Sequence, residues 1–293
     1  MSEETSTDKT NSINEVKTID FSKLSITDRF IFPLVMSHKE IAKPFIEAAL
    51  GIKIYDLRDP EQEKTEQVSV FGKSVRYDVF TQQIDKNGEV IRSFDIEMQV
   101  VDTKELPKRA RYYQSIRDTN ELRKGSLYGG LKDQYVLFIC PTDIFGAGLP
   151  IYSFQNFAVE NKNIALNDRT FKNYYIFKEY KRLPDVHPLK KYLKYFATNA
   201  ADSVETKEID SKVEWYKTDG LTQERYMTWE QEIQLAVENE RQRNEKVIAE
   251  QSKALAEQSK SLAEKDQALA EQAREIAKLK KQLAAASDTR QMA

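Results

Sequence analysis

An Asn-Gly pair between two runs of β-favouring residues most constrains the fold of this 293-residue chain. The runs are "RYDVFTQQI" and "EVIRSFDIEMQV", and Asn87-Gly88 lies between them. The pair is typical of a tight β-hairpin, because both central positions of a type I′ turn require positive φ. We therefore predict two antiparallel strands, over residues 74–84 and 89–101.

Polar side chains alternate along the second of these strands, at Asp95, Glu97 and Gln99. Side chains two residues apart on a strand point to the same face of the sheet. Asp78 lies on the neighbouring strand, so its carboxylate is expected close to the others. This face is either solvated, as antiparallel sheets commonly are on one side, or part of a site.

The segments around the hairpin give the order helix, three strands, helix, strand, which is typical of an α/β fold. Two helical pieces are predicted in "ITDRFIFPLVMSHKEIAKPFIEAALGI", with a break around Pro33 and a stop at Gly51. Residues 66–72 are the predicted third strand. Pro107 opens the helix "LPKRARYYQSIRDTNEL", and "DQYVLFIC" is an apolar run typical of a strand buried on both faces. Further strands are expected in "PIYSFQNFAVEN" and "NYYIFKEY", and a helix in "HPLKKYLKYFATNA".

A seven-residue repeat occupies the last quarter of the chain, where Gly and Pro vanish from about Thr222 onward. Strict seven-residue spacing predicts a left-handed coiled coil, and with it a homo-oligomer. The number of strands stays open because the second core line is poor in either register. The apolar line is Ile248, Leu255, Leu262, Leu269, Ile276 and Leu283, and the second line is Ser252, Ser259, Asp266, Ala273 and Lys280, or Gln258, Lys265, Gln272 and Leu279.

Composition divides the chain into three predicted parts. Residues 1–20 are polar and predicted to be disordered, residues 21–221 form one domain, and residues 222–293 form the coiled-coil helix. The 45 Lys and Arg against 47 Asp and Glu mean that a nucleic-acid surface has to be a local patch. Neither a secretory signal nor an apolar run of membrane-spanning length is present, so we expect a cytoplasmic protein without a membrane partner.

The motifs around the hairpin resemble a known group of nucleases. Asp78 on one strand, followed by "EMQ" (Glu97, Met98, Gln99) on the next, resembles the PD-(D/E)XK nuclease superfamily in the variant where Gln replaces Lys. More narrowly, "NGEVIRSFDIEMQV", "RARYYQSIRDTNELRKGSLYGGLKDQYVLFI" and "EYKRLPDVHPLKKYLKYFATNA" resemble the family of recombination-promoting nucleases and transposase-like proteins. The resemblance covers about residues 24–200. It implies a restriction-endonuclease-like core and hydrolysis of DNA phosphodiesters that depends on Mg²⁺ or Mn²⁺.

The resemblance also implies roles for single residues. Asp78 matches the metal-binding Asp, Glu97 the second metal-binding carboxylate, and Gln99 the position of the usual Lys. Asp95 is a candidate third ligand by its spacing, because Mg²⁺ prefers oxygen ligands. Family members often add an acid from the first helix, and either Glu40 or Glu47 could match it.

Positive charge near the acids is needed for DNA binding and for catalysis. Gln99 can position a water molecule but carries no charge, so another group has to offset charge in the transition state. The candidates, which are also the predicted DNA contacts, are Lys104, Lys108, Arg109 and Arg111. A second basic segment, Arg169–Lys194, interleaves its cations with Tyr residues, a mixture that suits backbone contact with stacking on exposed bases. For its helix around residues 188–196, an ordinary amphipathic helix with aromatic residues in the core and Lys at the surface is the favoured interpretation.

Two functions therefore emerge from the sequence. The first is a metal-dependent DNA endonuclease in which Asp78, Glu97 and Gln99 are catalytic and the coiled coil pairs two active sites. The alternative is a catalytically inactive DNA- or protein-binding module assembled through its coil, which the uncharged Gln99 favours. RNA as the substrate is not distinguished from DNA, because the metal chemistry is the same for both backbones.

Overall fold

The computed structural model describes residues 20–67, 74–101 and 104–291, and the chain divides into two compact units. The first unit ends at Tyr226 and the second begins at Met227. The predicted lead-in, residues 1–20, falls almost wholly outside the described part. Among the described helices, none is both long enough and apolar enough to span a bilayer.

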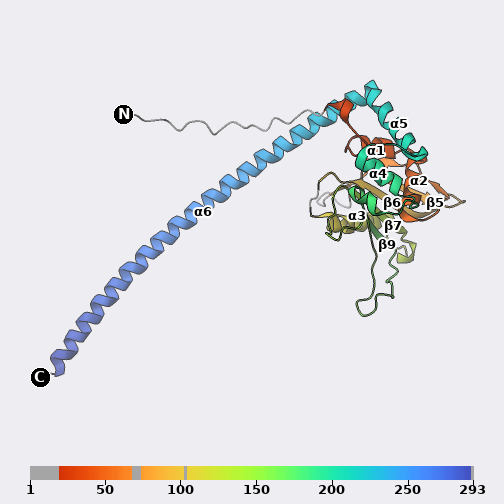
Figure 1. The fold of residues 1–293 in the computed structure, drawn as a ribbon. Helices are drawn as coiled ribbons and strands as arrows, with labels where there is room; N and C mark the ends of the chain where they lie inside the picture. The colour runs from red at the N-terminus through yellow and green to blue at the C-terminus, as the bar shows by residue number, and fades with distance from the viewer. Residues whose placement is uncertain (1–19, 68–73, 102–103, 292–293) are drawn as a thin grey trace, which may run out of the picture. The chain divides into compact units, whose positions relative to one another are not determined.

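A mixed sheet, with seven strands among the described residues, forms the centre of the first unit (Figure 1). Its strands are β1 (Asp56–Leu57), β2 (Glu61–Gln62), β5 (Val79–Ile84), β6 (Val90–Met98), β7 (Asp133–Cys140), β8 (Ile151–Phe154) and β9 (Thr170–Ile176). The order is β1-β5-β6-β7-β9-β8, with β2 also on β5. β6, β7 and β9 run parallel, whereas β5 and β8 are antiparallel to their neighbours. The predicted mixed α/β class is confirmed, and so is the central strand "DQYVLFIC".

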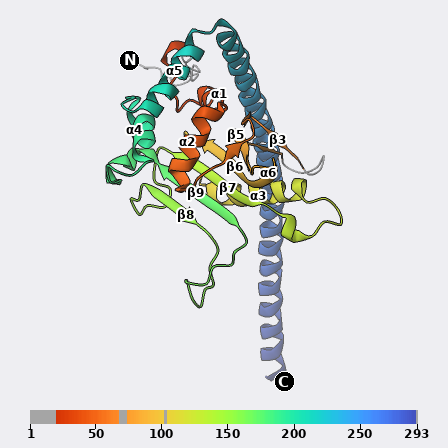
Figure 2. The same ribbon diagram turned by 90° about the vertical axis from the view of Figure 1, so that its right-hand side faces the viewer.

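The helices of the first unit cover both faces of this sheet (Figure 2). They are α1 (Ile31–Met36), α2 (Lys39–Leu50), α3 (Leu106–Glu121), α4 (Lys190–Thr198) and α5 (Val204–Thr218), with short 3₁₀ turns at Phe21–Lys23, Tyr128–Gly130 and Phe177–Arg182. α3 packs Leu106 and Ala110 onto one face, in a core with Phe138. On the other face the Tyr175 hydroxyl donates to the backbone oxygen of Ala49, at the end of α2. Side chains of β6 therefore alternate between two covered faces.

The predicted hairpin is present, but its turn is not type I′. Gly88 has a φ of 82°, whereas Asn87 is not among the described residues with positive φ. Instead the Asp85 carboxylate accepts hydrogen bonds from the N–H groups of Asn87 and Glu89, at 2.8 and 2.9 Å. A three-residue loop with a left-handed glycine results, which is another common hairpin connection.

Of the predicted third strand at residues 66–72, only the first two residues are described, and Glu66 does not join the main sheet. Thr65–Glu66 (β3) pairs with Val75–Arg76 (β4) in a separate two-stranded sheet, and residues 68–73 lie outside the described part. The short strands β1 and β2 take the place beside β5 instead. Alternation in a single run cannot distinguish pairing with one neighbour from pairing with another.

The break predicted around Pro33 is also misplaced. Pro33 lies inside α1, and the chain leaves the helix at Ser37 before α2 begins at Lys39. Pro33 is in the first turn of α1, where a missing N–H group removes no helical hydrogen bond. The predicted stop at Gly51 is confirmed, with a left-handed φ of 65°.

The second unit belongs to α6 (Gly220–Gln291), a continuous helix that begins within the first unit. The long C-terminal helix is therefore confirmed. The side chains of the apolar line that are described are exposed, with Leu262 and Leu269 each 62% exposed. A helix of this length with an unburied apolar line has little tertiary packing to stabilise it in a single chain. The sequence did not predict α5, which begins at a capping box formed by Ser203 and Thr206.

Candidate functional site

Asp78 and Glu97 face each other across the hairpin, directly before β5 and near the end of β6. The backbone N–H of Asp78 donates to Glu97 Oε1 at 3.0 Å. Asp78 Oδ2 in turn accepts from the N–H of Met98 at 2.9 Å. The antiparallel register continues this pairing with Val79 opposite Ile96. The two acids that the sequence placed on neighbouring strands are thus brought together.

Arg109, on the first turns of α3, reaches the same acids from above the sheet. Its Nη2 donates to Glu97 Oε2 at 3.1 Å and to the Tyr113 hydroxyl at 2.8 Å. Its Nη1 donates to Gln99 Oε1 at 2.9 Å. Arg109 and Tyr113 are four residues apart, so both lie on the helix face that covers the acids. A residue predicted to contact DNA is therefore part of the acidic site itself.

The acidic face of β6 is buried under α3 rather than solvated. Glu97 is 1% exposed, and Asp95 and Gln99 are also buried. Burial raises the pKa of Glu97 well above its usual range, and the nearby negative charges of Asp78 and Asp95 add to that effect while Arg109 opposes it. Burial likewise raises the pKa of Asp78 to about 6. Arg109 thus lies beside a group of carboxylates whose ionised form is unfavourable in this buried position.

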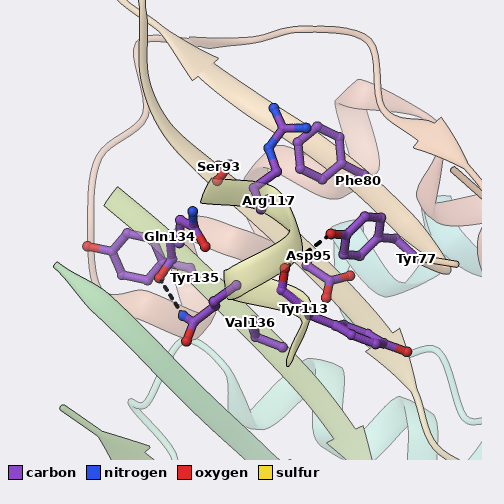
Figure 3. Close-up of a pocket in the computed structure, with 10 residues that line it drawn as sticks. Tyr77, Phe80, Ser93, Asp95, Tyr113, Arg117, Gln134, Tyr135 and Val136 are labelled. Atoms are coloured by element: carbon purple, nitrogen blue, oxygen red, sulfur yellow. Dashed lines mark hydrogen bonds between the residues drawn. The ribbon is translucent and has the colours of Figure 1, made fainter. Parts of the chain in front are cut away.

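Asp95 lies two residues before Glu97 on the same face of β6 and lines a small cavity of about 10 Å³ (Figure 3). Tyr77 and Tyr113 line the cavity beside it, with their ring centres 5.3 Å apart. Both carboxylate oxygens of Asp95 are buried and accept no hydrogen bond from the described residues. Burial raises the pKa of Asp95 well above its usual range. The cavity is about large enough for one water molecule.

Asp78 and Glu97 fit a divalent cation of the kind that the resemblance implies. Mg²⁺ is usually bound through one or two carboxylates together with waters and substrate phosphates. These two carboxylates lie close together, because each accepts a hydrogen bond from the backbone of the opposite strand. Within the described residues, however, no group of three His, Cys, Asp or Glu side chains is gathered to hold a metal ion. Asp95 as a third ligand is thus not supported.

The two first-helix acids make contacts on other parts of the chain. Glu47 Oε1 accepts from the backbone N–H of Ile54 at 2.8 Å, and Glu40 lies 3.5 Å from the His38 ring. These contacts give neither acid a role beside Asp78. The positive charge of Arg29, in contrast, lowers the pKa of Asp78, which places the segment before α1 near the site.

The remaining predicted DNA contacts lie on the surface. Lys108 and Arg111 are exposed on α3, and Lys104 is exposed just before it. Lys108 and Arg111 flank Arg109 in sequence but point to the solvated side of the helix. They therefore remain available to an anionic partner, whereas Arg109 is engaged by the acids.

The sequence missed a second buried ion pair under α3, between Arg117 and Glu66. The Tyr77 hydroxyl donates to Glu66 Oε2 at 3.3 Å, and burial raises the pKa of this tyrosine. Arg117 lies eight residues after Arg109, two helical turns further along the same face. That spacing was the signal for a helix face that carries two half-buried arginines.

Comparisons with protein-family models, with curated proteins and with solved structures give no match. The site geometry and the resemblance in sequence motifs are therefore the grounds for a functional proposal.

Proposed function

We propose that this protein is a metal-dependent DNA endonuclease that hydrolyses phosphodiester bonds, of the recombination-promoting, transposase-like kind. The observation that carries the proposal is the joint engagement of Glu97 and Gln99 by Arg109, beside Asp78. Two carboxylates, a carboxamide and a guanidinium in one place suit a reaction on a phosphate ester.

Each side chain has a distinct role in the proposed reaction. Asp78 and Glu97 would hold a divalent cation, Mg²⁺ or Mn²⁺, because backbone N–H groups orient one oxygen of each carboxylate. Such a cation would supply positive charge to the phosphate and lower the pKa of water. Gln99 orients the attacking water through its carboxamide, because it has acceptor and donor atoms but no charge.

Arg109 provides the positive charge that a lysine would carry in place of Gln99. Its guanidinium has five N–H donors, of which three are used by Glu97, Gln99 and Tyr113. Two donors, the Nε–H and one Nη1–H, are left to donate singly to the oxygens of a phosphate, and a hydrogen bond from a charged donor to a phosphate is a strong one. Positive charge aimed at the transition state is among the largest contributions to catalysis.

The arrangement of elements supports the finer fold that the resemblance implies. In a restriction-endonuclease-like core a helix precedes an antiparallel unit that carries the acids, and a helix then leads to a parallel strand. α2, the β5–β6 hairpin, α3 and β7 follow this order. The exposed apolar line on α6 supports a coiled coil between copies of the chain, which would bring two nuclease sites to one DNA molecule.

Cleavage of supercoiled plasmid tests the proposal. We expect nicked and linear products with Mg²⁺ or Mn²⁺, none with EDTA, and a loss of at least about 100-fold in Glu97→Gln, since an electrostatic contribution of this kind is typically worth 10²–10³ in rate. Glu89→Gln, on the exposed turn before the same strand, is the matched control and should cut like the wild type. Wild-type cleavage rates in Glu97→Gln would refute the proposal.

A catalytically inactive binding module is the second candidate, and one observation favours it. Arg109 already donates hydrogen bonds to the side chains of both Glu97 and Gln99, so a structural role accounts for these buried polar groups. Isothermal titration with Mn²⁺ separates the two candidates. Binding that is lost in Asp78→Asn supports the nuclease, whereas DNA binding without metal binding supports the module.

A further inference from the structure

A second cavity, of about 200 Å³, lies on the same face of the sheet as Glu97. Glu97 is paired with Phe138 on β7, and Phe138 with Tyr174 on β9. With parallel strands about 4.8 Å apart, the backbone positions of Glu97 and Tyr174 are about 10 Å apart. Pro107, at the start of α3, also lines this cavity. The cavity therefore lies at the same end of α3 as Arg109.

Aromatic rings connect the cavity with the acidic site. The guanidinium carbon of Arg109 lies 5.7 Å from the ring centre of Phe138. The Phe138 ring stacks on that of Tyr174, with centres 5.3 Å apart and planes 16° apart. Tyr174 is a wall of the cavity. A substrate held by Arg109 would therefore have its next nucleotides close to the opening.

Three rings, of Phe145, Phe154 and Tyr174, form the apolar part of what we name the three-ring pocket. The Phe145 ring centre lies 5.0 Å from that of Phe154 and 5.0 Å from that of Tyr174. Phe145 and Phe154 are 37% and 42% exposed, so their faces are open to a ligand. Open aromatic faces at a concave site are typical of pockets for flat ring systems.

Polar groups in the pocket lack partners of their own. Tyr174 is 1% exposed, and its hydroxyl oxygen is buried without a hydrogen-bond partner in the described part of the chain. Lys172 lines the pocket and forms no ion pair with any described residue; burial lowers its pKa, although the charge of Asp168 opposes this. An unmade hydrogen bond at a buried donor costs free energy, so a ligand with acceptor atoms would recover it.

The pocket also carries two carboxamides, of Gln155 and Asn156. The Asn156 amide nitrogen donates to Asp168 at 2.6 Å, which leaves its oxygen as an acceptor. Donors and acceptors beside aromatic rings match the edge and the face of a nucleobase, and Lys172 matches its phosphate. Few other ligands of a DNA-binding protein combine a flat ring with a negative charge.

We propose that the three-ring pocket binds an unpaired nucleobase of the substrate, next to the phosphate at the acidic site. The inference rests on the proposed nuclease function. A base in a duplex is stacked and paired, so it reaches such a pocket only when it is extruded or single-stranded. The protein therefore prefers DNA with a single-stranded or frayed segment over fully paired duplex.

The test is binding of the full-length protein to fluorescent DNA in EDTA, where cleavage cannot occur. Single-stranded and duplex forms of one sequence are compared by anisotropy, with 2-aminopurine as a stacking reporter. We expect Phe154→Ala to weaken single-strand binding by about 5- to 150-fold, the range for loss of one base–aromatic stack, and to abolish the 2-aminopurine quenching. Duplex binding should change little.

Phe157→Ala is the matched control, because Phe157 is also 42% exposed, lies three residues further along the chain and does not line the pocket. It should bind both forms like the wild type. Phe154→Tyr should retain single-strand binding, which separates loss of a ring from loss of folding. Equal effects of Phe154→Ala and Phe157→Ala, or a wild type without preference for single strands, would overturn the pocket.

Plasmid cleavage by the same preparations distinguishes the two proposals. If plasmid is cleaved with metal but the pocket variants bind single-stranded DNA like the wild type, only the pocket proposal is overturned. Single-strand binding that depends on Phe154, without any cleavage, overturns the nuclease and retains the pocket. Absence of all DNA binding overturns both.

Discussion

Asp78 and Glu97 position each other through the backbone of the hairpin. Glu97 Oε1 accepts from the N–H of Asp78, and Asp78 Oδ2 accepts from the N–H of Met98, which follows Glu97. Each carboxylate thus has one oxygen fixed by the opposite strand. Hydrogen bonds from N–H groups to a charged acceptor are stronger than those to a neutral one, so the two carboxylates are held in place before any ligand binds.

This relationship predicts different effects for two substitutions of Asp78. Asp78→Asn and Asp78→Ala both remove the charge and should both abolish cleavage. Asp78→Asn keeps an oxygen for the N–H of Met98, whereas Asp78→Ala leaves that donor unpaired. We expect Asp78→Ala to have a free energy of unfolding about 1–3 kcal/mol lower than Asp78→Asn, measured by urea denaturation. Equal stabilities would show that the hydrogen bond does not position the strand end.

The proposed role of Arg109 predicts that a lysine at position 99 can supply the positive charge in its place. Arg109→Gln removes the positive charge beside Glu97 and should lower the cleavage rate by about 100- to 1000-fold, as loss of one preorganised electrostatic group does. Adding Gln99→Lys restores a cation, because the Gln99 amide nitrogen is 3.5 Å from Glu97 Oε2. The double variant should therefore cut faster than Arg109→Gln alone. A double variant as slow as Arg109→Gln would contradict this prediction.

The buried carboxyl of Asp95 predicts a pH dependence of stability. Its pKa in the folded state is well above that in the unfolded chain, because of burial. The folded state therefore binds the proton more tightly, and this stabilisation is complete below pH about 4 and is lost as the pH rises through the folded-state pKa. Asp95→Asn should raise the melting temperature of the metal-free protein at pH 8.

The same substitution should have little effect at pH 4, where the Asp95 carboxyl is neutral in the folded state and only about half ionised in the unfolded chain. Asp59→Asn, at an exposed position, is the control and should leave the melting temperature unchanged at both pH values. Thermal denaturation in EDTA followed by circular dichroism measures the difference. An Asp95→Asn variant less stable than the wild type at pH 8 would mean that the buried carboxylate has a partner in solution.

The apolar line of α6 predicts that assembly depends on its leucines. Leu262→Glu with Leu269→Glu places charge on this line and should reduce the mass of the full-length protein in light scattering. Ala263→Glu with Ala270→Glu alters the next positions on the helix, about 100° away, and is the control that should keep the mass. A wild type that is already monomeric, or equal masses for both variants, would contradict assembly through α6.

The local features of the sequence predicted most of the elements. The Asn-Gly hairpin, the apolar run of β7, the helix after Pro107 and the long C-terminal helix depend on patterns within a few residues, and all are present. The errors arose where the outcome depended on distant partners. Glu66 pairs with Val75 in a separate two-stranded sheet and does not join the main sheet, and Pro33 was compatible with the first turn of a helix.

The sequence by itself placed Asp78 and Glu97 on the two strands of one hairpin, because the Asn-Gly pair and the flanking β-favouring runs are local signals. Their register also depends on the irregularity between Gln83 and Ile84, which the sequence did not show. Only the tertiary structure decided that α3 covers their face, that Arg109 reaches Glu97 and Gln99, and that Asp95 lines a small buried cavity. The physical reason is the separation along the chain over which each interaction acts. Turn geometry acts over a few residues, whereas the docking of a helix on a sheet depends on burial summed over contacts that are distant in the chain.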